Sequence, residues 1–559
     1  MEAPITQTCK WLLASGGLAA LALGSTAGSA RISIFDPAKT YIQARAAAMS
    51  GDHSRAAQLL ASLTESEPDQ PDIARKALLE AIGAGQMDLA LNLAHQVPST
   101  NLPTDARLLL VADEIRRGRA DRAISWLSAK GDGGDLTFLV PIVRAWAAAD
   151  QGNFDQALSA LDQVQQANLA AIVLESRAFI LLKAKRSADA EPIARRLVGS
   201  AGPREQRLRL ALADGFLAAG DRPRALMIVE GMGEGEAAAR QRVLAGRSSG
   251  QAIDNSAKAF SENLSALAAD LVRLQRSAPP IGIVQVARYL NPQSSSATAL
   301  LALMLAEQNR SEEALALLRS VPPGDTLISA IRDVEVQILI DRKRLNEAYQ
   351  IASIAAAAHD ADLADYSRLG KVLESMKRPA EAADAFGRAI SFAETHDLKG
   401  ELWQQLFYRA NALQDAGRWP EARQALQQAQ AIAPDEPLLL NFLGYAQLEH
   451  GENVDSAEAM IRKATELAPD NGSITDSLGW AQFKRGKVSE AIATLQEAAE
   501  KEPEQAEIQE HLGDALYKSG RHYEARFAWS AALVTAEDEI AARVKAKLSG
   551  GLSPANAAP

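Results

Sequence analysis

The side chains that could catalyse a reaction or hold a metal ion are scattered along this sequence. Its seven histidines include no HExxH pair of the kind that binds catalytic zinc. There is no phosphate-binding loop and no GxGxxG turn after a strand, and the GxSxG string at residues 246–250 does not follow a strand as a nucleophile elbow does. Carboxylates are numerous, as on any charged helical protein, and none stands out as a general acid or base. We therefore predict that the protein is not an enzyme and has no catalytic residue, no cofactor and no metal site.

The elements that position the side chains are repeats of one kind. An alanine recurs, mostly at steps of 33, 34 or 35 residues, and a turn-forming or small polar or basic residue stands five or six residues before each alanine. The alanines are Ala56, Ala90, Ala123, Ala157, Ala190, Ala225, Ala314, Ala348, Ala382, Ala422, Ala457, Ala491 and Ala525. The residues before them are Gly51, Gly85, Gly118, Gly152, Lys185, Gly220, Asn309, Lys343, Lys377, Gly417, Gly451, Gly486 and Gly520. Self-similarity at this period indicates helix pairs that stack into a solenoid, an architecture that binds other molecules.

The last three units, which span residues 437–539, show the pattern most clearly. The eighth residue of each is a glycine, which lets the second helix of the pair approach the first closely. After the turn, small and apolar residues recur at offsets of three and four, as on one face of a helix. Prolines such as Pro469 and Pro503 close the units, because the residue before a proline disfavours helix.

The segments "NFLGYAQLEHG", "DSLGWAQFKRG" and "EHLGDALYKSGRHYEA" resemble tetratricopeptide repeats. These are helix–turn–helix units with small residues at positions 8, 20 and 27 and a proline at position 32. The resemblance is strong from Leu363 to Glu539 and degenerate from Asp36 to Met232. It implies an all-α fold, a right-handed superhelical solenoid of about fourteen helix pairs.

The repeat spacing also divides the chain. Ser261 to Gln275 and Ile281 to Leu290 have the pattern of a helix pair within a degenerate stretch that is either a hinge or an ordinary loop insertion. The 40-residue step from Ala382 to Ala422 indicates a short insertion around Glu394 to Lys399. The predicted segments are a signal peptide (1–30), an N-terminal degenerate array (31–246), the degenerate unit and candidate hinge (247–295), middle repeats (296–362), well-formed C-terminal repeats (363–539), a capping helix (540–548) and a disordered tail (549–559).

The N-terminal residues have the pattern of a secretory signal. Lys10 precedes an apolar run from Trp11 to Leu23, and residues 28–30 fit the small-x-small rule for cleavage. The run is shorter than the roughly 20 residues of a membrane span. We predict cleavage before Arg31 and a periplasmic location, with an uncleaved anchor or an ordinary first helix as the alternatives. Cleavage would remove Cys9, the only cysteine, and with it any disulfide or thiolate chemistry; Cys9 also precedes the apolar run, so the usual lipoprotein signal is missing.

Composition narrows the class of partner. The formal net charge is −11, without a sustained basic patch, which argues against nucleic acid and anionic membrane surfaces as partners. Arg204, Arg207 and Arg209 form one local basic cluster, which we interpret as a solvated helix face. No apolar stretch after the signal is long enough to span a bilayer.

The family resemblance implies where a partner would bind. In tetratricopeptide proteins the first helix of each pair lines a concave groove, and positions 2, 5, 9, 12 and 13 face that groove. Rings there would supply buried area and polar groups would hydrogen-bond an extended peptide, whereas the alternative is that the rings pack between helices. Acidic residues at these positions argue against the clamp that holds a chaperone's C-terminal carboxylate. The predicted partner-binding residues, from positions 5, 9 and 12 of the last three units, are Asn441, Tyr445, Leu448, Asp476, Trp480, Phe483, Asp514 and Tyr517.

The block that begins at Trp403 also resembles exported tetratricopeptide proteins of Gram-negative envelopes. One such type is a lipoprotein adaptor that holds a carboxyl-terminal processing protease. We therefore predict a non-enzymatic scaffold or adaptor that binds protein or peptide partners in its groove, with an envelope protease as one candidate. The alternative is a structural subunit of a secretion or polysaccharide-export assembly. An aromatic groove should bind with weak salt dependence and a charged scaffold surface with strong salt dependence.

Overall fold

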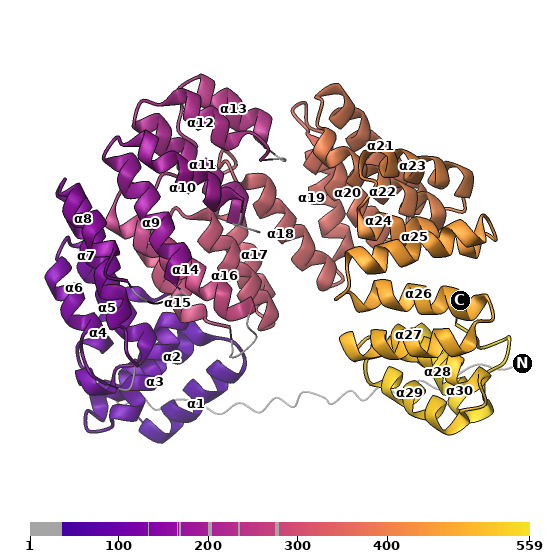
Figure 1. Ribbon diagram of the computed structural model, residues 1–559. Coiled ribbons are helices and arrows are strands. Elements are labelled where there is room, and N and C mark those ends of the chain that lie inside the picture. Colours follow the sequence, from indigo (N-terminus) through magenta and orange to yellow (C-terminus); the bar gives the residue numbers. More distant parts are fainter. Residues whose placement is uncertain are drawn as a thin grey trace, which may run out of the picture.

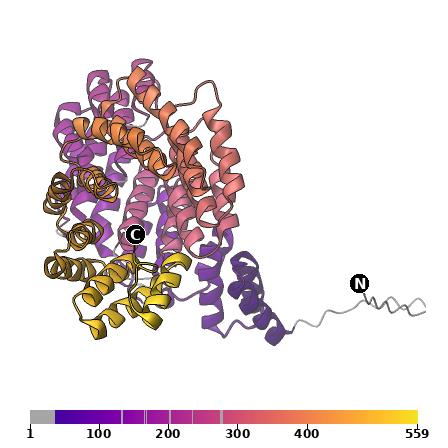
Figure 2. The same ribbon diagram turned by 90° about the vertical axis from the view of Figure 1, so that its right-hand side faces the viewer.

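The computed structural model describes residues 36–558, except for 132–133, 165, 167–168, 200–203, 233–234 and 274–278. The described residues form an all-α solenoid of fourteen helix pairs, with one further helix after the sixth pair and another after the last. Figure 1 shows two arrays of helices side by side, and Figure 2 views them with the C-terminal array towards the reader. The predicted signal peptide lies outside the described residues.

The first array contains six pairs and one extra helix. Two short 3-10 helices, Ser99–Asn101 and Thr137–Leu139, precede α5 and α7. The helices are α1 (Pro37–Met49), α2 (His53–Ser66), α3 (Pro71–Gly83), α4 (Met87–Ala94), α5 (Thr104–Arg116), α6 (Ala120–Leu127), α7 (Val140–Asp150), α8 (Phe154–Leu161), α9 (Ala170–Lys183), α10 (Ser187–Val198), α11 (Glu205–Ala218), α12 (Arg222–Val229) and α13 (Glu236–Leu244).

The remaining helices continue the pairing from α14 to α29 and end with α30. They are α14 (Ser256–Arg273), α15 (Ile281–Leu290), α16 (Ser295–Glu307), α17 (Ser311–Arg319), α18 (Ile328–Asp341), α19 (Leu345–Ala356), α20 (Leu363–Ser375), α21 (Pro379–Thr395), α22 (Lys399–Asp415), α23 (Trp419–Ile432), α24 (Pro437–Glu449), α25 (Val454–Leu467), α26 (Gly472–Lys484), α27 (Val488–Lys501), α28 (Ala506–Lys518), α29 (His522–Thr535) and α30 (Asp538–Gly550).

The repeat signature of the sequence marks the tightest points of this packing. All thirteen recurring alanines have 0% exposed surface, because each lies where the second helix of a pair crosses the first. All thirteen residues that precede them have positive φ. This is the left-handed conformation that ends a helix and turns the chain, and Lys185, Lys343 and Lys377 adopt it without being glycine. The predicted repeat period and the turn between the two helices are therefore confirmed at all thirteen positions.

The glycine at the eighth position is required for close approach of the two helices. A Cβ added at Gly479 would lie 2.7 Å from Cγ of Leu495, and one added at Gly513 would lie 2.3 Å from Cδ1 of Trp529. Both distances are shorter than a van der Waals contact, so the second helix would have to move outward.

We expect Gly513→Ala to lower the free energy of unfolding of the last repeats by about 1–3 kcal/mol. The indole of Trp529 is fully buried and cannot swing away from the added methyl group without opening the pair. Gly400→Ala in α22 is the matched control, because no atom lies within 4 Å of its added Cβ. That variant should be neutral or more stable by up to about 1 kcal/mol. Urea denaturation compares them, and equal stabilities would contradict the close-packing role of Gly513.

The segment predicted as a degenerate unit and candidate hinge (247–295) does not lie where a hinge between two arms would lie. Its helix pair exists as α14 and α15, but these helices lie on the inner side of the first array (Figure 1). α15 packs against α3 and α5, and α14 packs against α5, α7 and α9. These are the first helices of their pairs, which line the concave face. The hinge interpretation is corrected: the stretch is anchored in the groove of the first array and does not link two free arms.

The C-terminal end also differs from expectation. The capping helix α30 runs from Asp538 to Gly550, two residues beyond each predicted end. The tail predicted to be disordered is described to Ala558, forms a turn and packs back on the last repeat. The local sequence is rich in small residues, and its order comes from contacts with α28.

Candidate functional site

The concave face of the first array is filled by the chain's own residues 248–256. The carboxylate of Asp214, on α11, accepts hydrogen bonds from the Ser248 hydroxyl at 2.8 Å and from the backbone N–H groups of Ser249 at 2.7 Å and Gln251 at 3.0 Å. On α9, Lys183 donates to the Asp254 carbonyl at 2.6 Å. The first array therefore holds an extended segment of the same polypeptide.

A buried ion cluster then fixes α14 against the same face. Glu262 of α14 lies 2.6 Å from Arg204 and 2.6 Å from Arg207, and Arg204 also reaches Glu175 of α9 at 2.9 Å. Burial would raise the pKa of Glu262, but the two guanidinium groups outweigh it and lower that pKa. Burial dominates at Glu175 and raises its pKa. The solvated-face interpretation of the arginine cluster is thus corrected, since Arg207 is 8% exposed and is committed to α14.

α15 closes the other end of this groove. The Tyr289 hydroxyl donates to Asp113 of α5 at 3.0 Å, and the guanidinium of Arg116 lies 4.2 Å from the centre of the Tyr289 ring. The side chain of Gln285 donates to the Gly83 carbonyl at 3.3 Å. The groove-lining helices α3, α5, α7 and α9 of the first array are therefore covered by α14 and α15 of the same chain.

The second array, by which we mean α18 to α30, retains a concave cavity of about 240 Å³ between α18, α20 and α22. Arg368 forms part of its wall and is held by Asp333 at 2.6 Å and Asp365 at 2.7 Å. The ammonium of Lys371 lies 5.3 Å from the Tyr408 ring centre. Gln405 is 4% exposed, and its Oε1 has no hydrogen-bond partner among the described residues. The cavity is polar, with both donors and an unfilled acceptor.

The predicted insertion lengthens two consecutive helices beside this cavity. α21 and α22 have 17 residues each, four more than the 13 residues of α20 and α24. The first turn of the lengthened α22 supplies Glu401 to the cavity wall, which α18 and α20 complete.

The eight predicted partner-binding residues lie on α24, α26 and α28, as expected, but they are not equally accessible. Asp476 is 6% exposed, Trp480 is 2% exposed and Asp514 is 0% exposed. The other five, which are partly buried, are Asn441, Tyr445, Leu448, Phe483 and Tyr517.

The ring of Trp480 packs between helices. Its centre lies 4.0 Å from that of His511 on α28 and 4.8 Å from that of Phe483, with nearly parallel planes. Asp476 accepts a hydrogen bond from Nδ1 of His511 at 2.8 Å. The expectation of an exposed ring at Trp480 is corrected, because His511 of the next repeat covers its face.

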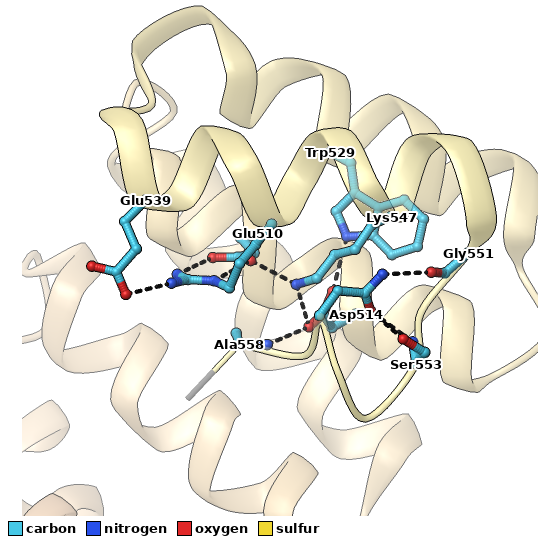
Figure 3. A network of polar contacts seen from close by, with 10 residues as sticks. Glu510, Asp514, Trp529, Glu539, Lys547, Gly551, Ser553 and Ala558 are labelled. Atoms are coloured by element: carbon cyan, nitrogen blue, oxygen red, sulfur yellow. Dashed lines mark hydrogen bonds and ion pairs between the residues drawn. The ribbon is translucent and has the colours of Figure 1, made fainter. Parts of the chain in front are cut away.

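Asp514 is covered by α30 and the tail (Figure 3), and Gly551 lies beside the Tyr517 hydroxyl. The ammonium of Lys547 lies 2.7 Å from Asp514 and 2.6 Å from Glu510, and all three side chains have 0% exposure. The N–H of Ala558 donates to Asp514 at 3.2 Å, which ties down the end of the chain. Asp514 is therefore corrected from an open groove position to a buried ion pair.

Sequence reasoning missed two carboxylates whose charge acts on Tyr445. Burial raises the pKa of Tyr445, and the negative charges of Glu449 on α24, Glu507 on α28 and Asp476 on α26 raise it further. Glu449 and Glu507 occupy positions 13 and 2 of their units, which the family resemblance assigns to the groove. Those positions could have identified them.

The stability of this region should depend on pH through His511. Burial alone would lower the pKa of its imidazole, but Asp476, with smaller effects from Glu507 and Asp514, raises it above the ordinary value. A raised folded-state pKa stabilises the fold fully below the ordinary pKa of about 6.5, and that contribution is lost as pH rises through the folded value. The difference in unfolding free energy between wild type and His511→Gln should thus grow on acidification across this window. A difference independent of pH would contradict the His511–Asp476 pair.

Neither a metal-binding cluster nor a membrane-spanning helix occurs in the described ranges. No group of three or more histidine, cysteine, aspartate or glutamate side chains is arranged to hold a metal ion there. Within those same ranges, every helix is too short or too polar to cross a bilayer.

The family comparison agrees with the helix-pair architecture. The family model "Tetratricopeptide repeat" matches residues 142–206, 409–472 and 477–539. No curated protein matches the chain. A chain of the crystal structure of the APC/C hetero-tetramer Cut9-Hcn1 is similar at 14% identity and a TM-score of 0.38, over 92% of this chain and 96% of that one. Yeast Tom70 is similar at 12% identity and a TM-score of 0.32, over 92% of this chain and 95% of that one. The human IFIT1 dimer with PPP-AAAA is similar at 14% identity and a TM-score of 0.32, over 77% of this chain and 95% of that one.

Proposed function

Since this chain is a tetratricopeptide repeat protein, a scaffold fold for protein–protein interaction, we propose that it binds an extended segment of a protein partner along the concave face of α18 to α28. The proposed role is non-enzymatic. The partner would lie across successive first helices and reach into the cavity beside Gln405.

One contrast carries this proposal. The concave face of the first array is occupied by residues 248–273 and 279–290 of the same chain. In the described part of the second array, by contrast, α20, α22, α24 and α26 pack closely only on helices of their own or neighbouring repeats. The cavity of about 240 Å³ and the unfilled Oε1 of Gln405 lie on this face. A partner therefore has polar groups to meet on the concave face of the second array, whereas part of the concave face of the first array is covered by the chain itself.

The finer assignment combines this surface with the sequence. We propose that the protein is exported and acts as an adaptor for an envelope protease, on the strength of its N-terminal pattern and its C-terminal block. Fractionation of the native cells and N-terminal sequencing test export, with Arg31 expected as the first residue of a periplasmic protein. A chain that retains residues 1–30 would remove the support for cleavage.

Groove binding is tested with the full chain and a displayed library of unstructured 15-residue peptides. A photo-crosslinking residue replaces Gln404, which is exposed on α22 beside the cavity, or Glu490, which is exposed on the outer helix α27 as the matched control. We expect enriched peptides to cross-link from position 404 and not from position 490. Peptides that cross-link equally from both positions, or a selection that enriches none, would reject the groove.

A further inference from the structure

The cavity of the second array has four charged residues in its wall, and two of them neutralise each other. Asp333 on α18 and Arg368 on α20 lie 2.6 Å apart, and Arg368 also pairs with Asp365 at 2.7 Å. The other two charged residues are Lys371 on α20 and Glu401 on α22. Neither side chain lies within 4.0 Å of an oppositely charged group or makes a hydrogen bond among the described residues. An unpaired cation and an unpaired anion of the described chain therefore line one cavity.

Lys371 can donate to a group that enters this cavity. It occupies position 9 of the unit that begins at Leu363, one of the positions that face the groove in tetratricopeptide proteins. The side chain is exposed, and its ammonium lies 5.3 Å from the centre of the Tyr408 ring. A cation–π contact attracts the ammonium to the face of the ring but leaves its N–H donors available. Lys371 can therefore pair with a carboxylate of a bound segment.

Glu401 reaches the cavity from the turn that the insertion adds. α24, α26 and α28 begin at the first residue of their units, whereas α22 begins at Lys399, four residues before Trp403, the first residue of its unit. Regular units of this array thus have no helical residue that corresponds to Glu401. The side chain is partly buried, and burial raises the pKa of its carboxyl group. A basic group that entered the cavity would offset the cost of burying this charge.

Uncharged polar groups in the same wall can hold the main chain of a bound segment. Gln405 is 4% exposed, and its side chain makes no hydrogen bond within the described ranges. A half-turn of its carboxamide exchanges Oε1 with Nε2, so the group can present either an acceptor or a donor. Ser367, at position 5 of its unit, lines the cavity with a hydroxyl that is also without a hydrogen bond in these ranges. Unmet hydrogen bonds of this kind favour a polar ligand over an apolar one.

Resting on the groove function proposed above, we infer that this cavity selects partner segments that carry one acidic and one basic side chain. The acidic side chain pairs with Lys371 and the basic side chain pairs with Glu401, while main-chain groups hydrogen-bond Gln405 and Ser367. Because the two charges come from different helices, α20 and α22, they also fix the direction in which the segment crosses the groove. Charge-assisted recognition of this kind weakens as salt is added.

The test is a selection from the same peptide library on the wild-type chain, on Lys371→Gln and on Glu401→Gln. Neither charge has a partner in the described ranges, so both variants should keep the fold. The matched controls are Lys545→Gln on α30 and Glu490→Gln on α27, because both residues are exposed and lie outside the cavity wall. We expect the wild type and the controls to enrich peptides that carry both acidic and basic residues. Lys371→Gln should lose the excess of acidic residues only, and Glu401→Gln the excess of basic residues only.

The best wild-type peptide gives a second readout. Replacing its acidic residue by the uncharged amide should weaken binding to the wild type about tenfold, with a smaller loss on Lys371→Gln. Replacing its basic residue by norleucine should have the corresponding effects on the wild type and on Glu401→Gln. The reversed pair, Lys371→Glu/Glu401→Lys, should select acidic and basic residues in the opposite order along the peptide.

The outcomes separate this inference from the groove function. Peptides that cross-link at position 404 without an excess of both acidic and basic residues would overturn the inference and leave the groove intact. An unchanged peptide composition on either single variant would also overturn it, as expected if Lys371 and Glu401 pair with each other in solution. A selection that enriches no peptide would reject both the inference and the groove.

Discussion

Lys547→Met is expected to unfold the end of the solenoid locally, at a cost of about 3–5 kcal/mol. The ammonium of Lys547 is fully buried and lies 2.6 Å from Glu510 and 2.7 Å from Asp514. Methionine has a similar volume but leaves Asp514 without its cation, whereas Glu510 still pairs with Arg543. Hydrogen exchange of the amides in α28 to α30, together with urea denaturation, would measure the loss.

The pH dependence of this loss identifies its cause. Burial already raises the pKa of Asp514 in the wild type, against the opposing effect of Lys547. Without Lys547 that pKa should rise further, so acidification protonates Asp514, removes the buried charge and narrows the gap from wild type. A loss that does not change with pH would point to packing and not to charge.

Two variants control for the loss of a lysine from α30. Lys545 is exposed on the same helix, and Lys545→Met should change the free energy of unfolding by about 0.5 kcal/mol or less. Adding Asp514→Asn to Lys547→Met should restore part of the stability, because no unpaired buried charge remains. If Lys547→Met behaves like Lys545→Met, the ion pairs do not hold the C-terminal segment in place.

Glu262→Gln is expected to release α14 from the first array, with a loss of about 3–5 kcal/mol. Glutamine keeps the shape of the side chain but leaves Arg207, which is 8% exposed, without its carboxylate at 2.6 Å. Arg204 loses one of its two partners and retains Glu175. Amides of α14 and α15 should exchange faster, and limited proteolysis should cut within residues 248–290 before it cuts elsewhere in the first array.

The matched control is Glu205→Gln, which removes another Glu–Arg pair of the same region. Glu205 is 38% exposed and pairs with Arg209 one helical turn away, so its loss should cost at most about 1 kcal/mol. If the amides of α14 exchange no faster in Glu262→Gln than in the wild type, apolar packing alone holds α14 in the groove.

The candidate site was predictable in position but not in accessibility. Repeat spacing places Tyr445 and Trp480 at equivalent positions of successive units, and both lie on the helices expected to line the groove. Yet Trp480 is buried because the next repeat supplies His511 at position 6, whereas the repeat after Tyr445 has Ser477 at that position and Tyr445 remains partly exposed. Exposure thus depends on the residue that the neighbouring unit presents, which a single repeat pattern does not contain.

By itself, the sequence determined the repeating unit of this protein: the buried alanines, the left-handed turns and the helix ends before Pro469 and Pro503. These features follow from contacts within one helix pair, so they leave a local period in the chain. Only the tertiary structure decided that residues 248–273 and 279–290 fill the first groove and that the tail covers Asp514. Those contacts join residues such as Tyr289 and Asp113, which are 176 positions apart. Burial of charge and shape fit between distant segments determine them, and neither leaves a periodic trace in the sequence.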